Sequence, residues 1–164
     1  MRKMKLPNEG KPFRIGLDLA ATNVPSLAEE LRSKKFVGYV ALCVRGRNGI
    51  EEAQALFDAG KIVACTYEYY RYEVTIEGEA AFKRFMNACA AAYGVIDVFA
   101  LDEDALHLAL VGNERAFFLA GDKPLQTPKV FSTALEEEAK ALMEAQREDL
   151  LKKYKLANLK QTKV

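Results

Sequence analysis

The hydrophobic pattern between residues 36 and 72 has the two-residue period of β-strands, and it divides into three segments. These segments are 36–44, 50–57 and 62–69. The first is apolar at nearly every position, which is typical of a central strand covered on both faces. Asn48-Gly49 predicts a tight hairpin turn with positive φ at both central residues, and Gly60 suits a left-handed position in the second turn. We therefore expect a three-stranded antiparallel meander.

Elsewhere the apolar residues recur every three or four positions, as on one face of an α-helix. Ser26 and Glu29 form a capping box for a short first helix. The stripe from Phe82 to Tyr93 predicts a second helix, and Asp102 can cap a third. A brief apolar segment at 95–101 predicts a further short strand. The sequence therefore predicts an α+β domain in which an antiparallel sheet, the meander plus this strand, is covered by helices.

A glycine and two prolines interrupt the regular pattern after this domain. Thr133 and Glu136 then form a second capping box, which opens a helix of about 20 residues, or roughly 30 Å. We divide the chain into an α+β domain at 1–119, a linker at 120–131, and a C-terminal amphipathic helix with a basic tail at 132–164. The apolar stripe of this helix must be buried somewhere. Its own domain and a partner subunit both remain open as the covering surface.

The 164 residues and 18.3 kDa fit one globular domain plus an appendage, and half of the residues are hydrophobic. The net charge of +1 provides no overall field that attracts nucleic acid or anionic lipid. Residues 1–14, which include a turn-rich lead-in at 6–12, carry +4, and residues 152–164 carry +5, so the rest of the chain carries −8. No apolar run has the length of a membrane span or a signal peptide. We expect a cytoplasmic protein.

Residues that could carry chemistry are few. The three cysteines lie 22 and 24 residues apart, which suits neither a disulfide framework nor a structural zinc site. His107 is the only imidazole, so a triad or a cysteine–histidine pair would have to use it, and its helical neighbours indicate a surface position. The carboxylates at 102–104 and 136–138 begin helices, where they complement the helix dipole. We expect no catalytic residue, no metal and no cofactor.

The most suggestive cluster lies at the end of the third meander strand, where tyrosines alternate with charged residues. Such aromatics can stack nucleobases, but the adjacent Glu68 and Glu73 repel phosphate. Tyrosine and arginine are also enriched at protein interfaces, and tyrosine packs well in sheets. We expect a partner or dimer surface here, with structural packing as the alternative. The expected contact residues are Tyr67, Tyr69, Tyr70, Arg71 and Tyr72 on the meander and Leu142, Met143 and Leu150 on the last helix.

Four short motifs together resemble an archaeal family known as domain of unknown function 2226. They are Leu6-Pro-Asn-Glu-Gly-Lys-Pro12, Leu56–Ala64, Gly78–Phe82 and Gly94–Val98. The pattern Phe-x-x-Gly-x-Ile-Val-x-Ala followed by Gly-Glu-x-Ala is more loosely similar to the PATAN signalling adaptor domain. The resemblance covers about residues 5–118. It implies a non-catalytic α+β module, which serves in regulatory assemblies in the adaptor and is uncharacterised in the archaeal family.

Together these features favour a non-catalytic protein-interaction or regulatory module that associates with itself. Two other classes remain open. One is a nucleic-acid-binding protein that uses the basic termini and the tyrosine-rich strand. The other is a small-ligand sensor with a pocket between sheet and helices.

Overall fold

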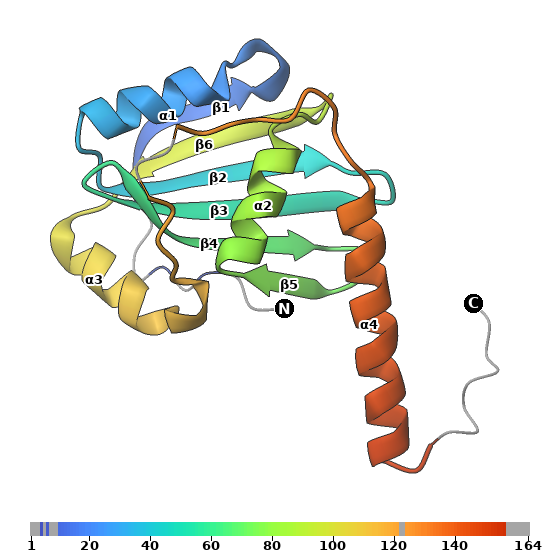
Figure 1. Cartoon of the computed structure of the whole chain (residues 1–164). Coiled ribbons are helices and arrows are strands. Elements are labelled where there is room, and N and C mark those ends of the chain that lie inside the picture. The colour runs from blue at the N-terminus through green and yellow to red at the C-terminus, as the bar shows by residue number, and fades with distance from the viewer. Residues whose placement is uncertain (1–3, 5, 7–9, 122–123, 157–164) are drawn as a thin grey trace.

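The computed structural model describes residues 4, 6, 10–121 and 124–156. One antiparallel sheet organises the fold, with strand order β1-β6-β2-β3-β4-β5 (Figure 1). The strands are β1 (Lys11–Asp18), β2 (Gly38–Arg45), β3 (Ile50–Asp58), β4 (Lys61–Tyr69), β5 (Val74–Glu77) and β6 (Gly94–Ala100). β2, β3 and β4 are the expected meander, and β6 is the expected further strand. β2 lies between β6 and β3, inside the sheet, as its two-sided apolar pattern predicted.

The sequence pattern did not predict the two edge strands, β1 and β5. β1 takes in the end of the expected lead-in, whose residues 7–9 lie outside the described part of the chain. Its pairing with β6 shifts register on both sides of Arg14, and Gly16 has a φ of 70°. Such irregularities bend an edge strand and weaken its periodic signal. β5 has only four residues, which is too short for an alternation to stand out.

The two hairpin turns differ from each other. Ala59 and Gly60 have φ values of 47° and 82°, so the tight turn with two left-handed residues joins β3 to β4. The same prediction for Asn48-Gly49 is wrong, because neither residue has positive φ. The loop between β2 and β3 is instead closed by the Gly46 N–H, which donates to the Gly49 carbonyl at 2.8 Å.

Helices cover both faces of the sheet. Helices α1 (Val24–Ser33) and α2 (Glu79–Ala88) pack on the face that carries the larger hydrophobic cluster. Helix α3 (Glu103–Gly112) packs on the other face, over a smaller cluster that includes Tyr39 and Leu56. Two short 3₁₀ helices lie at Leu19–Ala21 and Glu114–Ala116. Asn23, rather than Ser26, caps α1 by accepting a hydrogen bond from the Ser26 N–H at 3.0 Å. The α+β fold class is confirmed.

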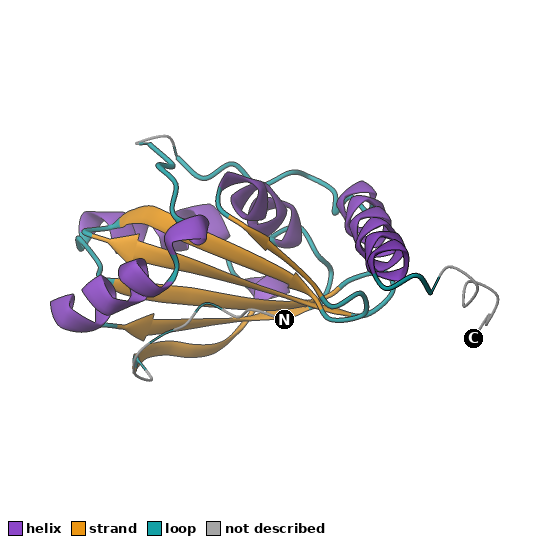
Figure 2. Ribbon diagram, turned by 90° about the horizontal axis from the view of Figure 1, so that it is seen from below, coloured by secondary structure: helices purple, strands orange, loops and turns teal. Residues whose placement is uncertain are grey.

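The segment between α3 and the last helix packs against the domain. Its apolar residues Phe118, Leu125 and Phe131 pack against the larger cluster. The segment therefore crosses the sheet on the same side as α1 and α2 and ends at helix α4 (Ala134–Lys153). Figure 2 shows α2 and α4 on one side of the sheet. In Figure 1, α4 starts beside the sheet and extends well past β5.

Candidate interaction site

The tyrosine-rich strand faces inward. Tyr67 and Tyr69 point to the sheet face under α2 and are only 1% and 2% exposed. They share this face with Cys65 because side chains two residues apart on a strand point the same way. These two tyrosines are therefore part of the core, and the expectation that they contact a partner is corrected.

The rest of the tyrosine cluster lies in the turn after β4. The Tyr70 hydroxyl donates to Oε2 of Glu52 at 2.6 Å, and the Tyr72 hydroxyl donates to Oε1 of Glu136 at 3.3 Å. Both rings are half-buried, whereas Arg71 is exposed. The hydroxyl groups of this cluster are thus used to hold the fold together. Arg71 is the most exposed member of the cluster.

A buried polar cluster lies where α4 meets the sheet, and we call it the root cluster. Its members are Glu51 of β3, Tyr67 of β4, Arg84 of α2 and Glu136 of α4, all 5% exposed or less. Oε2 of Glu51 accepts from the Tyr67 hydroxyl at 2.5 Å. Oε1 of Glu136 accepts from the Asn48 N–H at 3.2 Å. The hairpin loop and the first turn of α4 are therefore linked through a buried carboxylate.

The two carboxylates of the root cluster act on each other. Oε1 of Glu51 and Oε2 of Glu136 find no hydrogen-bond partner among the described residues. The pKa of Glu51 is raised to about 7, mainly because the carboxyl is buried and to a smaller degree because Glu136 is charged, although the Tyr67 hydroxyl and Arg84 oppose the shift. Glu51 consequently carries a proton more readily than an ordinary glutamate at neutral pH.

Side chains of α2 complete the attachment of α4. Arg84 donates to the Ala80 carbonyl at 3.1 Å and to Oε2 of Glu138 at 2.9 Å. Asn87 exchanges two hydrogen bonds with the backbone of Ser132, at 2.8 and 2.9 Å. The predicted capping box is absent, since Thr133 makes no side-chain capping bond. Glu136 turns into the root cluster instead of back to the cap.

Beyond this attachment α4 extends into solvent. Leu135 and Ala139 are buried and Met143 is half-buried, but every residue from 144 to 150 is exposed. Leu142 is 44% exposed and Leu150 is 54% exposed. We call residues 144–153 the free half of α4. The structure thus brings Met143 against the core, through its contact with the larger cluster, and leaves Leu142 and Leu150 uncovered.

The free half of α4 ends in an ordered turn. The Leu156 N–H donates to the Leu151 carbonyl at 2.8 Å, and the Lys155 N–H donates to the Lys152 carbonyl at 3.1 Å. Lys155 has a φ of 55°, which completes a Schellman-type helix end. The basic tail beyond it, residues 157–164, lies outside the described part of the chain.

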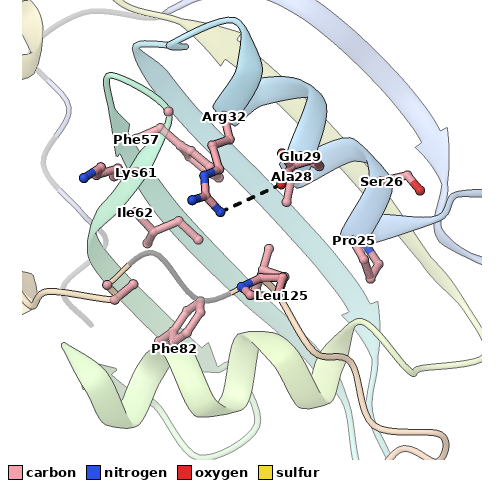
Figure 3. A pocket seen from close by; sticks show the side chains of 14 residues that line it. Pro25, Ser26, Ala28, Glu29, Arg32, Phe57, Lys61, Ile62, Phe82 and Leu125 are labelled. Carbon is pink, nitrogen blue, oxygen red and sulfur yellow. Dashed lines mark ion pairs between the residues drawn. The ribbon is translucent and has the colours of Figure 1, made fainter.

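A pocket of about 300 Å³ lies between α1, the β3–β4 turn and the linker (Figure 3). Phe57, Ile62, Phe82 and Leu125 give it an apolar lining. Arg32 and Lys61 add positive charge at the side of α1 and β4, where Arg32 lies 3.9 Å from the Glu29 carboxylate. Glu29 lines the pocket too, so apolar side chains lie beside charged groups of both signs.

The histidine and the cysteines that could carry chemistry are not members of the root cluster. His107 is exposed on α3. Cys65 is buried and Cys89 half-buried, and burial raises the pKa of both thiols, that of Cys89 to about 12, so they are poor nucleophiles. Within the described ranges no group of three or more histidine, cysteine, aspartate or glutamate residues could hold a metal ion. Among the helices of that same part of the chain, none has the length and apolar character to cross a bilayer.

The fold and its projecting helix define a compact α+β sheet module that carries one exposed helical arm. The chain belongs to DUF2226, an uncharacterized protein family conserved in archaea, which matches residues 4–113. This assignment confirms the resemblance of the sequence motifs to that family. No curated protein and no solved structure matches the chain. Since the match ends at residue 113, α4 lies beyond the matched residues.

Proposed function

We propose that the protein is a non-catalytic protein-interaction or regulatory module that associates with itself through the free half of α4. The observation that carries this proposal is the uncovered apolar side of that helix. Leu142 and Leu150 are about half exposed although they continue the side of α4 that is buried at its root. An exposed apolar stripe on a helix is typical of a surface that binds another helix or a groove.

The low intrinsic stability of an exposed helix also supports this proposal. Isolated helices shorter than about 12 residues are marginal in water, and the ten residues of the free half are all exposed except Leu151, which is half-buried. The root cluster fixes where this helix begins, and a partner would supply the packing that its outer turns lack. Glu51, whose pKa is raised, is 3% exposed and lies inside this attachment, which favours a structural over a catalytic role.

The test is the solution mass by light scattering, measured from about 10 µM to 1 mM because two short helices form a small interface. We expect the mass to rise toward twice 18.3 kDa. Leu150→Asp should abolish this rise, since it places a charge in the apolar contact. Leu108→Asp is the matched control, because Leu108 is 59% exposed on α3, a helix that lies at the other end of the sheet from α4 (Figure 1). A wild-type monomer at every concentration would refute the proposal.

A second candidate function is a small-ligand sensor, which the pocket between α1 and the linker favours. Thermal shift with a panel of aromatic and short-chain carboxylates would test it, since a ligand that binds only the folded state raises Tm. Phe82→Ala should remove the shift because the Phe82 ring lines the pocket. The nucleic-acid alternative loses Tyr67 and Tyr69 as stacking residues, since both are buried, and keeps the basic termini and the partly exposed residues 70–72.

A further inference from the structure

Charge is segregated along α4. Between residues 137 and 149 acidic side chains outnumber basic ones by five to two, whereas residues 150–156 contain three lysines and no acid. Glu138 is engaged by Arg84 at the root, so Glu144 and Asp149 are the acids closest to the free leucine side. The outer part of the helix therefore has an acidic middle followed by a basic end. Lys160 and Lys163 extend the basic end in the sequence.

The apolar side of the free half continues the side that is buried at the root. At 100° per residue, Leu150 lies within about 20° of Met143 around the helix axis, and Met143 lies about 40° from Ala139. Ala139 is fully buried, Met143 contacts the larger cluster and Leu150 is 54% exposed. The apolar side of α4 is therefore continuous: its first part packs against the core, and its outer part is exposed to solvent. The surface that can cover its outer part must be another chain or segment with an apolar side.

We infer that the free half of α4 pairs with α4 of a second copy of this chain, and that the two helices run antiparallel. This inference rests on the proposed self-association and adds its partner and orientation. In a parallel pair the lysine ends would lie side by side, and like charges in contact weaken association. An antiparallel pair centred near Leu150 places the lysine end of each helix beside the acidic middle of the other. Antiparallel helix dipoles also attract each other.

The orientation has a simple geometric signature. Gln146 and Tyr154 each lie four residues from Leu150, which is about 6 Å along the helix. An antiparallel pair centred on Leu150 brings Gln146 of one copy next to Tyr154 of the other. A parallel pair brings Gln146 next to Gln146 and Tyr154 next to Tyr154.

Cysteine cross-linking of the full chain distinguishes the two orientations. The background carries Cys43→Ser because Cys43 is exposed. Gln146→Cys and Tyr154→Cys proteins, one of them isotope-labelled, are mixed, oxidised and analysed by mass spectrometry. We expect the 146–154 cross-link to form at least about fivefold faster than either like-with-like cross-link. Lys152→Cys is the control, since it lies about 200° around the helix from Leu150 and should react with neither.

Charge reversal gives an independent readout by light scattering. Lys153→Glu/Lys155→Glu and Glu144→Lys/Asp149→Lys should each weaken self-association about tenfold at low salt, and mixing the two variants should restore it.

Each adverse result has a definite meaning. A wild-type protein that stays monomeric overturns the proposed function as well. A dimer with faster like-with-like cross-links overturns the antiparallel orientation alone. A dimer that forms none of these cross-links overturns α4 as the contact surface.

Discussion

Glu51→Gln should stabilise the protein at alkaline pH and have little effect in acid. An ordinary glutamate pKa of 4.5, raised to about 7 in the folded state, means that ionising Glu51 costs the folded protein about 3 kcal/mol at most. The folded state binds the proton more tightly than the unfolded state. The stability linked to this proton is therefore complete below pH 4.5 and is lost as the pH rises through 7. Solvent screening reduces the figure, so we expect a gain of about 2 kcal/mol for Glu51→Gln at pH 8.5.

Thermal unfolding at pH 4 and pH 8.5 checks this expectation. A gain of about 2 kcal/mol corresponds to a Tm increase of about 4–8 °C for a chain of this size. At pH 4 the carboxyl is protonated in both states, and Gln keeps its shape and its ability to accept from the Tyr67 hydroxyl, so Tm should change little. Glu144→Gln, an exposed carboxyl on α4, is the matched control and should show no pH-dependent gain. An equal effect at both pH values, or a loss of stability at pH 8.5, would refute burial as the cause of the raised pKa.

Two further substitutions test the packing, one beside Glu51 and one under α1. Gly46→Ala should destabilise the fold by about 1–3 kcal/mol, because the new Cβ would lie 2.0 Å from Oε1 of Glu51. The other oxygen of this carboxyl is held by a hydrogen bond. An unchanged midpoint in urea unfolding would contradict this packing. Leu31→Ala, at a fully buried position of α1, should cost about 2–5 kcal/mol in the same assay, whereas Leu108→Ala at an exposed position should stay within about 0.5 kcal/mol.

The sequence predicts the inner part of this fold well because each inner element has a clear hydrophobic pattern. β2 is apolar on both faces, and α2 carries a clear stripe, so burial and local pattern agree. The edges are harder to predict. β1 is exposed along most of its length and carries a glycine in the left-handed region, so its strand is set by pairing with β6 rather than by its own alternation.

The inward orientation of the tyrosines shows a different limit. The alternation of Tyr67 and Tyr69 correctly predicts a strand, but alternation alone does not say which side is covered. Cys65 gives the missing signal, since it shares their side and small thiol side chains are usually buried. Whether α2 or solvent covers that side depends on a helix that follows ten residues later in the chain.

Glu136 shows why the root cluster could not be found from local sequence. Three consecutive glutamates at a helix start are well explained by the helix dipole, and two of them are indeed exposed. The remaining glutamate, Glu136, is buried because it accepts a hydrogen bond from Asn48, which lies in a hairpin loop 88 residues earlier in the chain. Only the tertiary fold brings Asn48, Glu51 and Glu136 together, so no spacing rule predicts the contact.

The root cluster holds α4 in a fixed orientation, and this orientation favours association through the free half. Association costs orientational freedom, and that cost is smaller when the binding element is already held at a fixed angle. Hydrogen bonds from Asn48, Tyr72 and Arg84 to glutamates of the first turns fix that angle. Glu136 connects α4 to the hairpin loop and to the turn after β4, and Glu138 connects it to α2. The buried Glu51 beside them is tolerated although its raised pKa reduces stability at alkaline pH. Because α4 is held in this way, Leu150 can contact a partner at a smaller loss of orientational freedom.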